Sequence, residues 1–472
     1  MMKVNLTQNK NLKIFKIISQ VAHDRGQSVY VVGGYVRDLL LGRKFPTDID
    51  FVTESSGIEL AQTVAKSINP ETKVSVFKTY GTAMFRYENL ELEFVGARKE
   101  SYSVDSRNPQ VEQGTLEDDQ KRRDFTVNAM AISLNKDNFG ELIDPFNGME
   151  DMEQKILRTP LEPVQTYSDD PLRMMRAIRF ASTLGFSIEQ KSLEAIEKEA
   201  KRIEIITVER IMVEFNKIML SEKPSIGLEI MKKTGLLDIV LPELTALEGI
   251  EEVEGQKHKD NFWHTLEVVD NISKNTDNLW LRWAALLHDV GKAPTKKYVK
   301  GTGWTFHGHE FLGSKMVKTI FQRLKLPLGK DMKYVQKMVK LSSRPIALIS
   351  DDVSDSALRR MLFDAGEDLE DLFTLCKADI TTKNSYKQEK FKKNFEYVAK
   401  KIKEVEEKDH VRNFQPPITG EEIMQMFNMK PGREIGILKE RVKEAVLEGE
   451  IPNEHEAAKE LVIQEAKKIG LI

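Results

Sequence analysis

The sequence is poor in cysteine and in long apolar runs. Its one cysteine among 472 residues, Cys376, cannot form a disulfide within the chain, which fits a reducing compartment. No stretch reaches the roughly 20 apolar residues of a membrane-spanning helix, and the N-terminal MMKVNLTQNKNLK lacks the apolar centre of a signal peptide. We therefore expect a cytoplasmic protein with no membrane partner.

An excess of positive charge is also missing. The formal net charge of −3 excludes a protein that holds nucleic acid by charge spread over its whole surface. Basic residues do gather locally, at Lys121 to Arg123 and at Arg173, Arg176 and Arg179, so any RNA contact should be local. Hydrophobic residues make up 40% and charged residues 31%, which indicates a folded chain and not a disordered one.

The length indicates several folded units, because 472 residues are too many for one core. Six strand-like apolar runs lie in the first 145 residues, from which we expect a five-stranded mixed sheet. Beyond about Asp151, apolar residues recur every three or four positions, so the remainder should be helical. The expected fold class is α+β, with a small mixed-sheet head over 1–145, a helical neck and body over 146–255, a third helical unit over 256–405 and a helical tail over 406–472.

Two aspartates in the segment VVGGYVRDLLLGRKFPTDIDF are candidates for catalysis. Asp48 and Asp50 alternate around one residue, so on a strand both carboxylates point to the same face. Together they can hold Mg²⁺, the hard cation that suits oxygen ligands, in a two-metal reaction. A third carboxylate would come from LELEFV, where Glu93 is the candidate; Glu91 shares its phase, and either can be a solvent-facing strand residue.

The Gly-Gly turn before these aspartates is a candidate phosphate site. Gly33 and Gly34 permit close backbone approach to a triphosphate, and Arg37, one turn into the next helix, can pair with phosphate oxygens. A Gly-Gly turn or an Asp-x-Asp alone is weak evidence. In this order and spacing, however, the string resembles the nucleotidyltransferase superfamily, specifically the class II branch that holds bacterial CCA-adding tRNA nucleotidyltransferases and bacterial poly(A) polymerases.

That resemblance implies a polymerase-beta-like head that adds C, C and A to the 3′ end of tRNA from CTP and ATP, without a nucleic-acid template. The partner would be the tRNA acceptor arm. The segment KRRDFTVNAM resembles the second motif of the family, which holds the incoming nucleotide and contacts its ribose. Arg122 and Arg123 offer phosphate forks, Asp124 can accept from a ribose hydroxyl, and Asn128 follows one helical turn later. We also expect Asp124 to be a helix N-cap, a plain alternative that does not exclude its role in binding the nucleotide.

The segment SDDPLRMMRAIRFASTLGF should begin a helix, with Asp170 as its cap and Pro171 in its first turn. It resembles the carboxylate-Asp-x-x-Arg motif with which class II enzymes read the base; Asp170 and Arg173 match, and Asp169 stands where Glu is usual. Arg176 is a further nucleotide-binding candidate. A basic helix paired with acidic neighbours is the plain alternative.

Hydrogen-bonding patterns explain how one carboxylate and one guanidinium can choose a base. Cytosine and adenine both present an amine donor beside a ring-nitrogen acceptor, which complements this pair. Uracil and guanine present the reverse order and would leave two polar groups unpaired, at roughly 1 to 3 kcal/mol each. Two further segments resemble motifs of the family. DPFNGMEDMEQKILRT resembles the connecting motif between head and neck, in which Asp144 and Gly148 would have hinge and packing roles. VERIMVEFNKIML, with Glu209, Arg210 and Glu214, resembles the last neck motif, whose role would be positioning.

A second metal site is expected behind the head, because five of the eight histidines lie between residues 258 and 309. The string AALLHDVGKAPT resembles the HD superfamily of metal-dependent phosphohydrolases, so the unit over 256–405 would be an HD domain. Imidazole and carboxylate ligands suit a divalent transition metal or Mg²⁺, and spacing does not choose among them. His307 is a weaker candidate. The resemblance implies as ligands His264, His288, Asp289, His309 and Asp379.

Other functions remain open from the sequence. Addition of the terminal A alone, or poly(A) polymerisation, would use the same head; the choice would depend on a loop within residues 98–120 that contains Arg98, Tyr102 and Arg107. The HD-like segment and the acidic overall charge argue against the polymerase, which usually carries a basic tail to hold generic RNA. A phosphohydrolase acting at the HD site, with the head as an RNA-binding module, is an alternative of a different class. An RNA chaperone is a third, against which the complete motifs argue.

Overall fold

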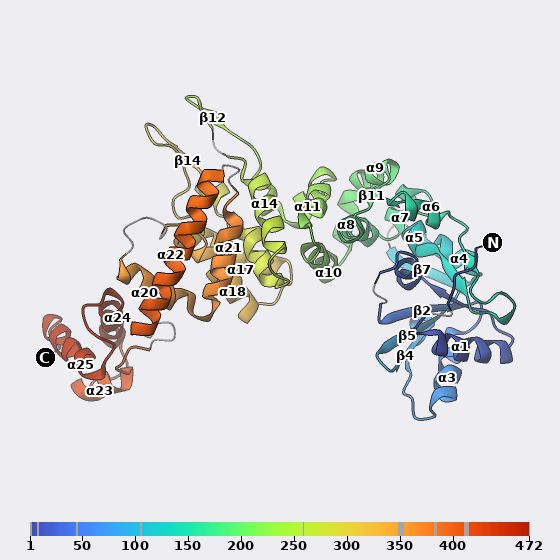
Figure 1. Ribbon diagram of the computed structural model, residues 1–472, viewed down its shortest axis with the longest axis horizontal. Coiled ribbons are helices and arrows are strands. Elements are labelled where there is room, and N and C mark those ends of the chain that lie inside the picture. Colours follow the sequence, from blue (N-terminus) through green and yellow to red (C-terminus); the bar gives the residue numbers. More distant parts are fainter. Residues whose placement is uncertain are drawn as a thin grey trace. The chain divides into compact units, whose positions relative to one another are not determined.

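The computed structural model divides into two compact units, Met1–Leu241 and Pro242–Ile472, which are described separately below (Figure 1). No helix within the described residues is long and apolar enough to cross a membrane. The residues that the structure describes are 2–6, 9–43, 46–103, 106–257, 259–347, 354–381, 385–409 and 415–471.

The first unit begins with a mixed sheet of seven strands. Its only parallel pair is β2–β5, and the other neighbours are antiparallel. The expected number of five strands was wrong: all six predicted runs join one sheet, and the seventh strand, with two residues, is too short to show alternation. The order is β3 (Ser75–Phe77), β4 (Thr82–Tyr87), β5 (Leu90–Gly96), β2 (Asp48–Thr53), β1 (Val29–Val32), β8 (Ala131–Ser133) and β9 (Leu142–Ile143).

Two amphipathic helices, α1 (Leu12–Asp24) and α3 (Gly57–Ile68), pack against this sheet. Phe51 of β2 lies in the core between them and the sheet, with its ring centroid 6.1 Å from that of Phe15 in α1 and 4.8 Å from that of Phe94 in β5. Because side chains alternate along a strand, the even-numbered residues of β2 point away from this core. The two candidate aspartates therefore share the opposite face.

Shorter elements surround that opposite face. Helix α2 (Gly34–Leu40) follows the Gly-Gly turn, and α4 (Leu116–Lys121) and α5 (Thr126–Ala129) carry the second motif. The segment that was predicted as a loop contains a hairpin, β6 (Arg98–Ser103) with β7 (Ser106–Gln113). The side chains of Tyr102 and Arg107 lie outside the described residues.

The remainder of the first unit is helical, as the sequence predicted, apart from one short parallel pair, β10 (Ile156–Leu157) with β11 (Ser187–Ile188). Helix α8 is central, because it packs against both α10 and α11. The helices are α6 (Gly148–Glu153), α7 (Pro163–Asp169), α8 (Leu172–Leu184), α9 (Gln190–Glu199), α10 (Val208–Met219), α11 (Pro224–Lys233) and α12 (Leu236–Val240).

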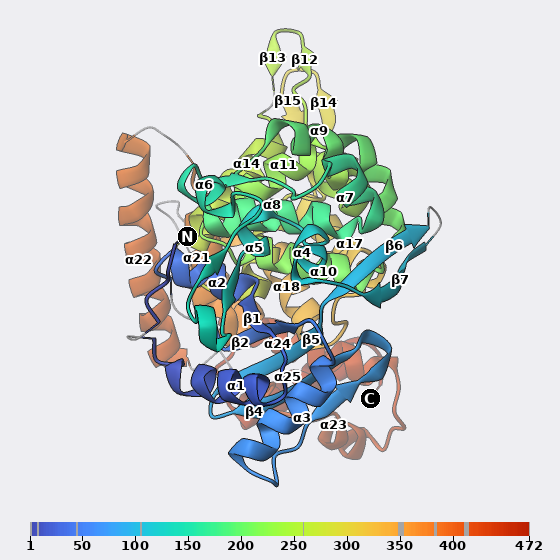
Figure 2. The same ribbon diagram turned by 90° about the vertical axis from the view of Figure 1, so that its right-hand side faces the viewer.

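The second unit is also mainly helical, so the expected order of a mixed-sheet head followed by helices is confirmed. Two small hairpins, β12 (Glu252–Val253) with β13 (Gln256–Lys257) and β14 (Lys297–Val299) with β15 (Gly303–Thr305), project side by side (Figure 2). The helices are α13 (Pro242–Thr245), α14 (Asn261–Ser273), α15 (Leu279–Leu287), α16 (Lys292–Thr295), α17 (His309–Arg323), α18 (Lys330–Leu341), α19 (Arg344–Ala347), α20 (Asp355–Ala365), α21 (Leu369–Asp379), α22 (Ser385–Asp409), α23 (Gly420–Phe427), α24 (Arg433–Glu448) and α25 (His455–Lys468).

Candidate functional site

The parallel pairing of β2 with β5 brings carboxylates together. Asp50 is opposite Glu93, and Asp48 is opposite Glu91. Since paired positions of neighbouring strands point to the same face, all four lie on the face away from the aromatic core. Glu91 lies near Arg86, with 3.7 Å between its Oε2 and the Nε of the arginine. Glu93, beside the half-buried Asp50, is therefore the better third carboxylate.

Electrostatics support a cation at this face. Burial raises the pKa of Asp50, the guanidinium of Arg123 lowers it, and the charge of Asp48 raises it further. Burial also raises the pKa of Glu93, followed by the charge of Asp50. Carboxylates that hinder one another's ionisation are a donor set that a divalent cation would stabilise. These residues therefore fit the Mg²⁺ site that the sequence predicted.

The Gly-Gly turn lies directly against these groups. Gly33 has φ 75°, and a Cβ atom there would lie 3.1 Å from Nη1 of Arg123 and 3.3 Å from Oδ2 of Asp50. A side chain at this position would fill the space between the carboxylate and the guanidinium. At Gly34 the nearest atom to such a Cβ is Nη2 of Arg37, at 3.6 Å, an ordinary contact. The close approach that the sequence predicted thus depends on the first glycine.

Arg37 lies inside the protein. Its Nε and Nη2 donate to the carboxylate of Asp38, each at 2.9 Å, and its Nη1 donates to Oδ1 of Asn128 at 2.7 Å. It is only 8% exposed. In this position the guanidinium braces α2 against α5, and its predicted contact with phosphate stays a prediction.

A buried carboxylate that the sequence analysis missed orients the two arginines of the second motif. Asp119 accepts from Nε of Arg122 at 2.9 Å and from Nη2 of Arg123 at 2.9 Å. Burial raises the pKa of Asp119, but Arg123 and Arg122 outweigh it and hold that pKa below its usual value. The signal was available, since Asp119 precedes the arginines by the three and four residues of one helical turn.

Asp124 joins the second motif to the base-reading helix. Its Oδ1 accepts from Nδ2 of Asn128 at 2.9 Å, and its Oδ2 accepts from Nε of Arg176 at 2.7 Å. Burial would raise the pKa of Asp124, but Arg176 and Asn128 together lower it to about 2. The alternative of an N-cap is wrong, because α5 begins at Thr126 and its cap position is Phe125.

The predicted base-reading pair begins α8. Oδ1 of Asp170 accepts from the backbone N–H of Leu172 at 3.2 Å, but the cap position of α8 is Pro171, so the predicted cap at Asp170 was wrong by one residue. Nη1 of Arg173 donates to the carbonyl of Thr166 at 3.3 Å and Nη2 to that of Arg122 at 2.6 Å. These two bonds fix the guanidinium and leave three of its five N–H donors for a ligand. The two residues at the start of α8 can therefore offer one acceptor and one donor.

A buried phenyl ring under the arginines was also missed. The Cζ atoms of Arg37, Arg176 and Arg179 lie 4.9, 5.6 and 3.6 Å from the ring centroid of Phe180. Glu214 of α10 accepts from Nε of Arg179, which agrees with its predicted positioning role. The spacing RMMRAIRF was the available signal, because it places the ring one helical turn after Arg176.

The carboxylate of the predicted connecting motif has a local role. Asp144 accepts from the backbone N–H groups of Gly148 at 2.7 Å and Met149 at 2.9 Å. These bonds satisfy the first free donors of α6. The hinge and packing roles that the resemblance implied for Asp144 stay predictions.

The second unit contains a compact cluster of metal-binding groups. The ligand atoms of His264, His288 and Asp379 all lie within 4.8 Å of one another, and this is the one such group of three within the described ranges. Nε2 of His264 lies 2.8 Å from Oδ1 of Asp379. Nε2 of His288 is buried without a hydrogen-bond partner, which is costly unless it binds a ligand.

Hydrogen bonds to Nδ1 direct the imidazoles of this cluster. Nδ1 of His288 donates to the carbonyl of Ala285, and Nδ1 of His309 donates to that of Phe306, both at 2.8 Å. Such bonds leave Nε2 as the metal ligand. Asp289 lies between the two rings, 3.3 Å from Nε2 of His288 and 3.6 Å from Nε2 of His309. The structure thus brings all five predicted ligands together, whereas His307 is exposed.

Three family descriptions match successive parts of the chain. Residues 29–158 match the poly A polymerase head domain, and residues 185–248 match a probable RNA- and SrmB-binding site of polymerase A. Residues 261–379 match the HD domain. The first of these ranges contains the carboxylate face, and the third contains the histidine cluster.

Similar proteins extend over most of the chain. A CCA-adding enzyme of Bacillus velezensis is 30% identical over 439 residues, which are 92% of this chain and 93% of that protein. An A-adding tRNA nucleotidyltransferase of Deinococcus radiodurans is 33% identical over 351 residues, which are 72% of this chain and 78% of that protein. A multifunctional CCA protein of Pseudomonas fluorescens is 33% identical over 306 residues, covering 63% and 71%.

Solved structures support the same fold. A CCA-adding enzyme of Bacillus stearothermophilus in complex with CTP has a TM-score of 0.68 at 23% identity, over 98% of this chain and 99% of that one. A tRNA nucleotidyltransferase with a primer tRNA and an ATP analogue has a TM-score of 0.55 at 26% identity, over 81% and 98%. Fold and site together define a nucleotidyltransferase with an HD domain. The chain belongs to the class II family of CCA-adding and A-adding tRNA nucleotidyltransferases.

Proposed function

We propose that this chain adds C, C and A in turn to the 3′ end of tRNA, using CTP and ATP. The observation that carries the proposal is the fixed pair of Asp170 and Arg173, which offers an acceptor and a donor beside the second motif. Only cytosine and adenine complement both groups. The similarity to a CCA-adding enzyme over 92% of the chain supports the complete C, C, A product.

The carboxylate face would hold Mg²⁺ through Asp48, Asp50 and Glu93. Bound there, divalent cations activate the 3′ hydroxyl for inline attack and stabilise the leaving pyrophosphate. The turn at Gly33 leaves room for a triphosphate beside Asp50. Arg123, oriented by Asp119, provides a charge-assisted donor for its oxygens.

Addition of A alone is the second candidate, because A-adding relatives match this chain at 33% identity. The two products separate in one assay. The purified protein receives CTP and ATP with tRNA that ends at the discriminator base or in CC. Our proposal predicts growth by C, C and A that stops, and loss of growth in Asp48→Ala. If the protein adds only A, and only to the CC-ended tRNA, it is an A-adding enzyme and the proposal of C, C and A addition is wrong.

We also propose that the HD domain hydrolyses a phosphoester with the help of a divalent metal. Support comes from the orphaned Nε2 of His288 and from Lys292, whose Nζ lies 2.6 Å from Oδ2 of Asp289 and can turn to a phosphate. Release of phosphate from a generic phosphoester, with Mn²⁺, Ni²⁺, Co²⁺ or Mg²⁺ added, tests this. Activity that vanishes in His288→Ala supports the proposal; absence of activity with every metal leaves a structural metal site.

A further inference from the structure

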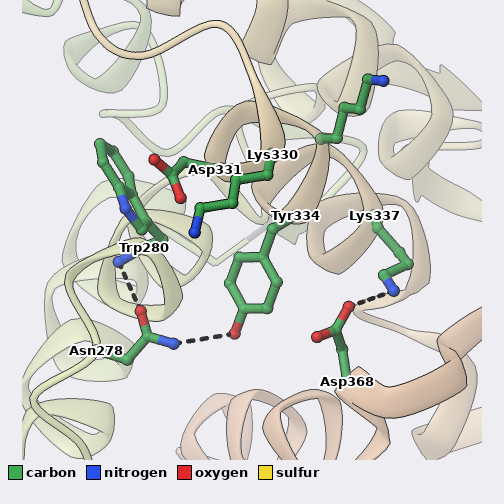
Figure 3. A pocket seen from close by; sticks show the side chains of 8 residues that line it. Asn278, Trp280, Lys330, Asp331, Tyr334, Lys337 and Asp368 are labelled. Carbon is green, nitrogen blue, oxygen red and sulfur yellow. Dashed lines mark hydrogen bonds and ion pairs between the residues drawn. The ribbon is translucent and has the colours of Figure 1, made fainter.

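A cavity of about 590 Å³ opens in the second unit where three helices begin (Figure 3). Helix α15 contributes Trp280, and α18 contributes Tyr334 and three lysines, among them Lys330. The wall is completed by Asp368, directly before α21. Figure 3 shows the labelled side chains of Trp280, Lys330 and Tyr334 close to one another along this lining. None of them belongs to either site described above.

One face of α18 supplies most of the lining. Lys330, Lys333, Tyr334 and Lys337 recur at intervals of three, one and three residues, which places them on one side of a helix. The opposite side, with Met332 and its apolar neighbours, is buried in the core. The segment KDMKYVQK therefore combines one face for packing with one basic and aromatic face toward the cavity.

The two rings are held in place. The ring centroid of Trp280 lies 5.7 Å from that of the buried Phe321, so core packing anchors the indole. The hydroxyl of Tyr334 donates to Oδ2 of Asp371 at 2.6 Å and accepts from Nδ2 of Asn278 at 3.5 Å. Rings that are fixed before a ligand arrives lose little entropy on binding. Trp280 is half-buried, so the part of its ring that lines the cavity is open to a ligand.

The lysines of the lining differ in whether their ammonium groups have partners within the protein. Nζ of Lys337 is paired with Asp368 and donates to the carbonyl of Ala365 at 3.0 Å. Lys330 and Lys333 are exposed, and neither forms an ion pair or hydrogen bond within the part of the chain that the structure describes. Two free lysines and an anchored indole in the lining of one cavity are the elements that bind a phosphate and a base together. The carboxylate of Asp331, also in the lining, can accept from ribose hydroxyls or a base amine.

The cavity is separate from the HD cluster. Trp280 is in the first turn of α15, whereas His288 directly follows that helix. At about 1.5 Å per residue, the two lie roughly 12 Å apart along the axis. Helix α21 likewise separates the two sites by its length, because it begins beside the cavity and ends at Asp379. A ligand here would contact α15 and the start of α21, the two elements that lead to His288, Asp289 and Asp379, without touching these residues.

We propose that this cavity binds a nucleotide, with the base on Trp280 and the phosphate on Lys330 and Lys333. The nucleotide would be either free in solution or part of an RNA strand. Both sources present the same base, ribose and phosphate. The proposal does not depend on catalysis by the head, because every group that it uses lies in the second unit.

Tryptophan fluorescence provides a direct test. All four tryptophans lie in the second unit, so nucleotide bound at the head is invisible to this signal. The full-length protein is titrated with AMP, ATP, adenosine, inorganic phosphate and a short single-stranded RNA. We expect quenching by AMP and ATP at concentrations at least about tenfold below those for adenosine or phosphate, because each of these lacks half of the contacts. Quenching by RNA but not by mononucleotides would assign the site to RNA and also support it.

Variants decide whether the signal comes from this cavity. Trp280→Phe should remove the quenching, and Lys330→Ala with Lys333→Ala should raise Kd about tenfold or more. The matched control replaces two exposed lysines outside the cavity, Lys318 and Lys340, by alanine and should leave Kd unchanged. If RNA is the source, the Lys330/Lys333 variant also raises the KM for tRNA. Quenching that persists in Trp280→Phe, or no quenching by any of these ligands, overturns the proposal.

Discussion

Asp124 shows how one residue connects separate motifs. Its carboxylate accepts from Asn128 of the second motif and from Arg176 of the base-reading helix. It is 7% exposed, so solvent does not substitute for either partner. Loss of the charge therefore leaves the half-buried guanidinium of Arg176 without the carboxylate that it pairs with, a change that costs more than removing a fully exposed pair.

The first prediction concerns the pH dependence of this contact. The folded pKa of Asp124, about 2, lies below the unfolded value near 4. The contact therefore contributes fully above about pH 4 and is lost as pH falls from about 4 to 2, a change of about 2.5 kcal/mol. Asp124→Asn should lower the free energy of unfolding by about that amount at pH 7 and flatten its decline in acid. Unfolding in urea is followed by circular dichroism, which reports both units, and by tryptophan fluorescence, which reports the second unit only. The transition that appears in circular dichroism alone gives the free energy of unfolding of the first unit.

A comparison with Asp137→Asn provides the control, since Asp137 is exposed. That variant should match the wild type at every pH. If Asp124→Asn also matches the wild type at pH 7, the buried contact contributes nothing and this account of the site fails.

The second prediction concerns the ring beneath the arginines. Phe180→Leu keeps an apolar side chain but removes the π face, so Arg37, Arg176 and Arg179 lose contacts worth about 0.5 to 2 kcal/mol each. We expect the KM for CTP and ATP to rise about tenfold while kcat falls less, because binding geometry changes and the carboxylate face does not. Steady-state kinetics measure both constants. A fall in kcat with unchanged KM would place the effect on the chemical step and argue against a positioning role.

Sequence reasoning worked best for residues whose role is local. The shared face of Asp48 and Asp50 follows from strand geometry alone. Asp119 was missed because a carboxylate before basic residues is common on solvated helices. Phe180 was missed because its value arises from Arg37, which reaches it only through the tertiary fold.

At the scale of elements, three helices and the turn after α15 create the HD cluster. Helices α14, α17 and α21 contribute one ligand each, and His288 and Asp289 directly follow α15. The histidine density of the sequence indicated a metal site, and the resemblance to the HD superfamily implied its ligands. The carbonyl of Phe306, which directs the ring of His309, could not be predicted, because backbone hydrogen bonds leave no trace in residue type.

The third prediction concerns the metal of this cluster. The purified protein should retain a divalent metal, and a chelator should lower the melting temperature reported by tryptophan fluorescence, because bound metal stabilises the folded second unit. His288→Ala should lose both the metal and the chelator effect. His307→Ala is the matched control, since His307 is exposed beyond the cluster. Equal metal content in both variants, measured by mass spectrometry, would show that the cluster is not the metal site.

The sheet illustrates what pattern alone predicts at this scale. Alternation located β1, β2, β3, β4, β5 and β8, whose apolar residues face a core. It did not give the parallel pairing of β2 with β5, which aligns Asp50 with Glu93. Register depends on contacts between strands distant in sequence. From the sequence alone, the third carboxylate could therefore be narrowed to Glu91 or Glu93 but not assigned to one of them.

At the scale of the whole molecule, each site is contained within one unit. The groups of the head site run from Gly33 to Glu214 in the first unit, and the HD ligands run from His264 to Asp379 in the second. The sequence predicted four domains; the boundaries at 145, 255 and 405 stay predictions. The containment of each site has a functional consequence.

The fourth prediction is that the two sites can be inactivated independently. Asp50→Asn should abolish nucleotide addition, by about a thousandfold or more, because the carboxylate face loses a charge that its cations need. The same variant should keep the metal of the HD cluster. His288→Ala should show the reverse pattern. Loss of nucleotide addition in His288→Ala, with the first unit still folded, would mean that the HD cluster takes part in the transfer reaction.

The most direct test of the central claim is the base selectivity of Asp170→Asn. Incorporation of each of the four nucleotides into tRNA is measured singly, as kcat/KM, for this variant and for the wild type. The wild type should accept only CTP and ATP. An amide can donate where the carboxylate only accepts, so UTP should gain at least about tenfold relative to CTP in the variant. Unchanged selectivity in an active, folded variant would contradict base reading by Asp170 and Arg173.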